Sequence, residues 1–106
     1  MKYVNITPHT INLVCEDGKE VVIAPSGIVA RVSEFFVRQS YDIVPLVSSE
    51  FGTVFDLPDP EDGVMYITSR IVMGAAPDRT DLCAPGSLLR DGEGKIVGCT
   101  NLIVRG

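Results

Sequence analysis

The sequence has no tryptophan, a single histidine and three cysteines among its 106 residues. The cysteines Cys15, Cys83 and Cys99 are odd in number and far apart, and none belongs to a C-x-x-C pair. A disulfide framework favours an even count, and zinc sites usually bring their ligands in close pairs. We therefore expect reduced thiols, no metal and no cofactor.

Long apolar runs and positive charge are also scarce. No stretch approaches the roughly 18–20 apolar residues that span a bilayer, and the N-terminus lacks a signal-peptide pattern. The net charge of -5 and the pI of about 4.6 argue against direct DNA binding, which normally shows as a basic patch. We expect a soluble, cytoplasmic protein that does not bind membranes, located in the host cytoplasm if a phage encodes it. Its length predicts a single domain over residues 1–106.

β-Branched residues are abundant: the chain has 14 valines and nine isoleucines. Such side chains suit a pleated surface better than a helix, and ten glycines and seven prolines divide the chain into short segments. This pattern predicts a mainly β fold. The expected architecture is a small twisted sheet, sandwich or open barrel of six to eight short strands with one short helix.

Alternation of apolar residues indicates strands over residues 3–6, 11–15, 21–23 and 28–32, which we interpret as a β-meander. Asp17-Gly18 lies between two of these strands and is a strong hairpin signal. Residues 35–38, 43–47 and 51–55 are also β-prone, but Pro45 cannot donate within a central strand. Residues 57–63 form an acidic connector whose two prolines exclude a ladder, and we interpret it as a surface loop.

One helix is predicted at about residues 69–76. Ser69 provides an N-cap, small apolar side chains follow at helical spacing, and Pro77 ends the helix. The last third returns to strands at residues 88–89, 95–99 and 102–104, with a turn over residues 91–94.

The first candidate site is the segment Asn5-x-Thr7-Pro8-His9. Pro8 restricts the backbone, so that Thr7 and His9 are held in a repeatable geometry between two strands. The imidazole suits a ligand contact or a general base. In the simpler interpretation, Thr7 and His9 hydrogen-bond the backbone of a tight corner.

Two further candidates contain arginine. Ser69 and Arg70 lie where a strand gives way to the helix, and backbone N–H groups at such a junction favour anions, although N-capping alone explains Ser69. Arg79 and Asp81 lie in a turn-rich loop, either as ligand contacts or as anchors of that loop. As a hypothesis, Thr7, His9, Ser69, Arg70, Arg79 and Asp81 form one ligand-binding pocket, within the chain or at a homodimer interface.

Recognised catalytic motifs are missing. The sequence has no G-x-S-x-G, H-E-x-x-H or H-x-E with C-x-x-C. The spacing in the sequence neither supports nor excludes a nucleophile–base pair formed from Cys83, His9 and Asp81. The sequence therefore leaves enzymatic activity open and favours a non-enzymatic role without catalytic residues.

Several ordered motifs resemble a family of small uncharacterised proteins from bacteriophages, prophages and bacterial genomes. They are N-I-T-P-H-T-I at residues 5–11, P-S-G-x-V-A-R-V at 25–32, Y-I-x-S at 66–69, P-x-R-x-D-L at 77–82 and P-G at 85–86. The resemblance implies a phage setting and no mechanism. It favours accessory roles, such as countering host immunity.

We therefore expect a phage or prophage accessory binding protein, with countering host defence as one role, that sequesters a small anionic, nucleotide-like ligand or occludes a host protein. A homodimer or higher homo-oligomer is compatible with this role. Two alternatives are a small hydrolase acting on a nucleotide-type substrate with His9 and Asp81, and a structural or assembly protein of the virion.

Overall fold

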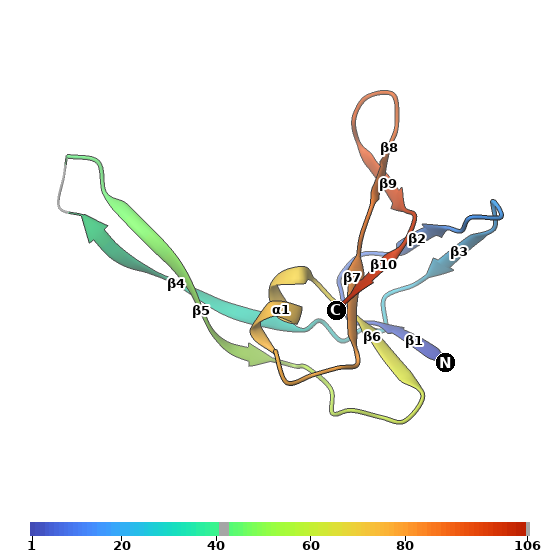
Figure 1. Ribbon diagram of the computed structural model, residues 1–106, viewed down its shortest axis with the longest axis horizontal. Coiled ribbons are helices and arrows are strands. Elements are labelled where there is room, and N and C mark those ends of the chain that lie inside the picture. The colour runs from blue at the N-terminus through green and yellow to red at the C-terminus, as the bar shows by residue number, and fades with distance from the viewer. Residues whose placement is uncertain (41–42, 106) are drawn as a thin grey trace.

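The computed structural model describes residues 1–40 and 43–105 of the chain, which form ten strands and one short helix (Figure 1). The expected mainly β class with one short helix is confirmed. The strand number exceeds the predicted six to eight, and two strands are ten residues long instead of short. The elements are β1 Lys2–Asn5, β2 Ile11–Val14, β3 Glu20–Ile23, β4 Arg31–Ser40, β5 Leu46–Phe55, β6 Val64–Ile67, α1 Arg70–Ala75, β7 Leu82–Pro85, β8 Leu88–Arg90, β9 Ile96–Cys99 and β10 Leu102–Val104.

The first sheet has the order β1-β6-β7-β10. β1, β6 and β7 run parallel, and β10 pairs antiparallel with β7. Parallel neighbours need a crossover, and α1 provides it between β6 and β7. The helix begins after the N-cap Ser69, whose side chain accepts a hydrogen bond from the Val72 amide, as the sequence predicts.

The second sheet has the order β3-β2-β9-β8 and contains two hairpins joined by the parallel pair β2 and β9. The β2–β3 turn contains Gly18 and the β8–β9 turn contains Gly94, each with a φ of 83°. This left-handed backbone favours glycine. Both predicted turns are therefore confirmed.

The third sheet is the hairpin of β4 and β5, which we call the arm. It extends away from the other elements in Figure 1. Among its described residues, the base joins the core through Val32 and Val54, which pair across the two strands. Pro45 lies just before β5 and takes no part in the ladder, as expected.

The predicted β-meander is wrong. Of the first four strands, only β2 and β3 pair with each other, because β1 joins β6 in the first sheet and β4 pairs with β5. Alternation reports which residues share a face of a strand and carries no information about the partner strand. The acidic connector, in contrast, forms no ladder, as predicted.

The core consists of two clusters. One packs α1 against the first sheet and the base of the arm, around Ile6, Tyr66, Val72 and Leu82. The other lies between the two larger sheets and contains Ile11, Ile67, Cys83 and Cys99. Within the described part of the chain, no helix is long and apolar enough to cross a membrane.

Thr68 is expected to limit the stability of the core. Its side chain is 1% exposed, and its Oγ1 has no hydrogen-bond partner among the described residues. A buried unsatisfied hydroxyl costs about 1–3 kcal/mol, so the isosteric Thr68→Val should raise the free energy of unfolding by about 1 kcal/mol. Urea denaturation measures this change, and a destabilised variant would show that the hydroxyl does have a partner.

Candidate functional site

The corner between β1 and β2 is built on the side chain of Asn5, which is 1% exposed. Its Nδ2 donates to the carbonyl oxygens of His9 at 2.7 Å and Ile23 at 3.0 Å. Its Oδ1 accepts from the backbone N–H of Thr7 at 2.9 Å and from the Thr7 hydroxyl at 2.7 Å. This one amide therefore ties the end of β1 to the corner and to the end of β3.

Thr7 belongs to the same network. Its hydroxyl lies 3.0 Å from the His9 carbonyl oxygen and 3.3 Å from the His9 backbone nitrogen. Thr7 therefore stabilises the corner, as the simpler interpretation of this segment predicts. The bonds fix the backbone of His9 and leave its exposed imidazole without a hydrogen bond or ion pair in the part of the chain that the structure describes.

His9 is one of the residues that line an open groove of about 620 Å³. The groove lies where β2, β8 and β9 meet the end of β7, and its lining is residues 9–12, Pro85, Leu88 and residues 96–99. Leu88, Ile96 and Val97 remain about half exposed, so the walls are apolar. Pro85 ends β7, a parallel strand of the first sheet, and ligands of open α/β sheets commonly bind beyond the carboxyl ends of such strands.

Arg79 and Asp81 form a bidentate ion pair. Arg79 Nε and Nη2 each lie 2.8 Å from one Asp81 carboxylate oxygen, and both side chains are mostly buried. The hydrogen bond from Arg79 lowers the pKa of Asp81, and the same bond raises the pKa of Arg79. The Asp81 carbonyl oxygen also accepts from the Tyr66 N–H, so the pair anchors the loop that enters β7.

Loss of the Asp81 charge is expected to destabilise the protein in a pH-dependent way. Because the folded pKa of Asp81 is depressed, its stabilising effect is full above the ordinary pKa near 3.8 and is lost as pH falls through the folded value. Asp81→Asn should cost about 1 kcal/mol at pH 7. The difference in free energy of unfolding between Asp81→Asn and the wild type should become smaller as the pH falls toward 3.

Urea denaturation at pH 7, 5 and 3 checks this, with Asp62→Asn on the exposed connector as the matched control. The control should stay close to the wild type at each pH. A deficit of Asp81→Asn that is constant with pH would show that its charge does not stabilise the fold.

The structure does not bring the six predicted site residues into one pocket. Thr7 and Ser69 follow the parallel neighbours β1 and β6, so they leave the first sheet at its carboxyl edge, where Arg70 begins the helix. Arg79 and Asp81 precede β7 and lie at the amino edge, at least three residues of strand, or about 10 Å, away. Only His9 lines the groove.

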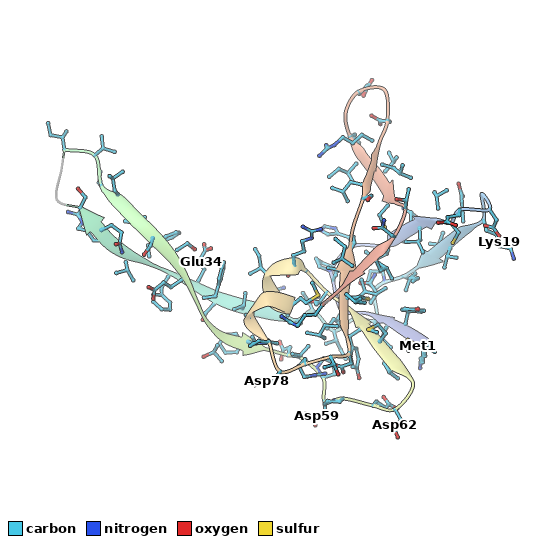
Figure 2. The ribbon with its side chains drawn as sticks, viewed as in Figure 1. Met1, Lys19, Glu34, Asp59, Asp62 and Asp78 are labelled. Atoms are coloured by element: carbon cyan, nitrogen blue, oxygen red, sulfur yellow. The ribbon has the colours of Figure 1, made fainter. Side chains whose placement is uncertain are left out.

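The amino edge carries an acidic surface. Figure 2 shows Asp59, Asp62 and Asp78 at the same end of the molecule, and the connector is held there by the Tyr66 hydroxyl, which lies 3.1 Å from the Asp59 carbonyl oxygen. A smaller hollow of about 430 Å³ at residues 27–29 and 56–58 includes Asp56 and no arginine or lysine. An anionic ligand would meet repulsion at both places.

Cys83 is unsuited to nucleophilic chemistry. It is fully buried, and desolvation raises the pKa of its thiol to about 11, so that the neutral thiol predominates at neutral pH. His9 lies at the carboxyl edge of the first sheet and Asp81 at the amino edge, so the imagined set of Cys83, His9 and Asp81 does not assemble. In the described ranges 1–40 and 43–105, no cluster of three histidine, cysteine or acidic side chains is arranged to hold a metal.

Two structural roles escape the sequence interpretation. Asn5 was part of the first motif, but its position at the centre of the network depends on the distant Ile23 carbonyl group. Arg105 donates from Nη2 to the carbonyl oxygens of Met73 and Ala76, which end α1. A basic residue near a helix C-terminus is a known signal, but Arg105 lies far from α1 in sequence.

Comparison of the chain with protein-family models, with curated proteins and with solved structures found no match. The assignment of a function therefore rests on the groove, the arm and the chemistry of their side chains.

Proposed function

We propose that the protein is a non-enzymatic binding module and that the groove at His9 receives its ligand. The observation that carries this proposal is a mostly apolar groove of about 620 Å³ lined in part by His9, whose imidazole has no hydrogen bond to any described residue. Ligand sites typically have volumes of about 300–1,000 Å³, mostly apolar walls and a few polar groups that orient the ligand.

The groove favours a small ligand with an apolar or flat body and one anionic or hydrogen-bonding end. Leu88, Ile96 and Val97 would contact the body, and the His9 imidazole would bond the polar end. A nucleotide-like molecule has this chemistry. In a phage or prophage setting, retention of such a molecule would withhold a signal from host defence, which is the accessory role that we propose.

Calorimetric titration with a panel of cyclic and linear nucleotides tests the proposal. Wild-type protein should give saturable heat with at least one nucleotide, and His9→Ala and Ile96→Asp should each weaken binding at least tenfold. Ile71→Glu on α1 is the control, because Ile71 is similarly exposed and lies outside the groove, and it should bind normally.

The proposal fails if no nucleotide gives heat or shifts the melting temperature, or if the groove variants bind as tightly as the wild type. The ligand should also be recovered intact after heat denaturation of the complex. Recovery of a cleaved product would instead support the hydrolase alternative, for which the separation of His9 and Asp81 offers no support.

The arm favours one second candidate, a structural or assembly role in the virion. Extended elements that project from a body can join subunits in head-to-tail contacts, which build rings or open filaments. Light scattering distinguishes this role, because an assembly protein should form large particles, whereas a binding module should form a small closed species.

A further inference from the structure

The chain exposes more surface than a folded monomer of its mass. A monomer of 11.4 kDa is expected to expose about 5,800 Å², whereas this chain exposes 7320 Å². Its radius of gyration is 16.5 Å, compared with about 13 Å for a compact domain of this length. The excess of about 1,500 Å² is the scale of a protein interface.

Much of this excess lies on the arm. Directly paired residues share a face of the ribbon, so the register places Phe51 opposite Glu34 and Phe36 opposite Ser49 on one face. Phe35 and Val37 lie on the other face. Phe36 is 64% exposed and Phe35 is 48% exposed, and Figure 2 shows side chains projecting from both sides of the arm, on which Glu34 is labelled.

A two-stranded hairpin of this kind needs another element packed against it to be stable in water. An isolated two-stranded hairpin is at best marginally stable in water, and beyond its base the arm has no third strand or helix from the described chain against it. The Ser49 hydroxyl donates a hydrogen bond to a Glu34 carboxylate oxygen at 2.7 Å, which satisfies one polar atom on the face of Phe36 and Phe51. The face of Phe36 and Phe51 therefore presents exposed aromatic side chains beside Glu34 and Arg38, a mixture suited to contact with a protein.

The charge of the arm fits a second copy of the same chain. The whole chain has a net charge of -5, but residues 31–55 carry two arginines, two glutamates and one aspartate, a net charge of only -1. Two acidic bodies repel each other when they meet directly. Contact between two nearly neutral arms brings two copies together with less of that repulsion.

We propose that the arm docks on a second copy of this chain, with the face of Phe36 and Phe51 at the contact. If each chain covers its excess surface, a dimer buries about 3,000 Å², which lies within the range of about 2,000–5,000 Å² of obligate homodimers. Reciprocal contact of two arms also closes the assembly with two-fold symmetry. This inference does not depend on the groove or its ligand.

Sedimentation velocity over about 1–200 μM protein tests the proposal, with Phe36→Glu as the arm variant. The wild type should be a dimer, and Phe36→Glu should raise the dimer dissociation constant at least 100-fold. Val104→Glu on β10 introduces the same charge at a residue of similar exposure and should leave the dimer intact.

A monomeric wild type across this range overturns the proposal, as does a Phe36→Glu variant that dimerises normally or a control that dissociates equally. If Phe36→Glu does not fold, the wild type alone remains decisive, because the melting temperature of a dimer rises with protein concentration. A melting temperature independent of concentration, with a monomer mass, overturns the proposal without any variant.

Discussion

Replacement of Asn5 with aspartate is expected to lower the free energy of unfolding by about 3–5 kcal/mol at pH 7. The two side chains have the same shape, but aspartate has no N–H group to donate to the carbonyl oxygens of His9 and Ile23. A carboxylate would instead face two carbonyl oxygens at a site that is 1% exposed. The cost combines two lost hydrogen bonds with a buried charge for which only the two hydrogen bonds from Thr7 compensate.

Urea denaturation of Asn5→Asp and of Asn12→Asp measures this effect. Asn12 is exposed on β2 and undergoes the same chemical change, so it should stay within about 0.5 kcal/mol of the wild type. Equal stability of the two variants would show that the corner does not depend on the Asn5 amide.

Gly98→Ala is expected to cost about 2 kcal/mol by overpacking. A Cβ atom at residue 98 would lie 2.8 Å from the Asn12 carbonyl oxygen, which belongs to the backbone of the adjacent strand β2. Because a backbone atom cannot rotate away, β2 and β9 would have to separate. Their parallel pairing joins the two hairpins of the second sheet, so the damage should extend beyond the substituted residue.

Gly92→Ala is the control for this prediction. Residue 92 lies in the β8–β9 turn, where an added Cβ meets nothing within 4 Å, and its backbone is not left-handed. Thermal denaturation should show a lower melting temperature for Gly98→Ala and little change for Gly92→Ala. If Gly98→Ala and Gly92→Ala have the same melting temperature, the close approach of β2 and β9 does not constrain the fold.

Local features of the fold can be predicted from the sequence because their causes are local. Asp17-Gly18 determines a hairpin through the left-handed backbone of Gly18, and Ser69 determines the start of α1 through one hydrogen bond to Val72. Pro45 cannot donate to a ladder and lies outside β5. Each of these signals acts within a few residues, so no knowledge of the tertiary structure is needed.

Pairing between distant strands cannot be predicted in this way. β1 joins β6 in parallel, and about 60 residues separate Lys2 from its partner Val64. The alternation of apolar residues in β1 is equally compatible with a hairpin between β1 and β2. For this reason the sequence predicts a β-meander that the structure does not have. The arm is ambiguous for a related reason: Phe35 and Phe36 place apolar groups on opposite faces, so alternation identifies no buried side.

The candidate site was predicted only in part. The sequence identifies His9 as a side chain held by a rigid corner, and the structure places it at the groove. The groove itself also requires Pro85, Leu88 and Ile96, which come together only through the pairing of β2, β8 and β9. Arg79 has no signal in the sequence that separates an anchor from a ligand contact, and its bond to Asp81 assigns it to the loop.

The central claim is that a second copy covers the arm, and amide hydrogen exchange tests it most directly. Amides of β4 and β5 should exchange slowly in the wild-type dimer and quickly in Phe36→Glu, while β1, β6 and β7 remain equally protected in both proteins. Fast exchange along the arm of the wild type at about 200 μM would contradict the claim, because an uncovered hairpin opens readily in water.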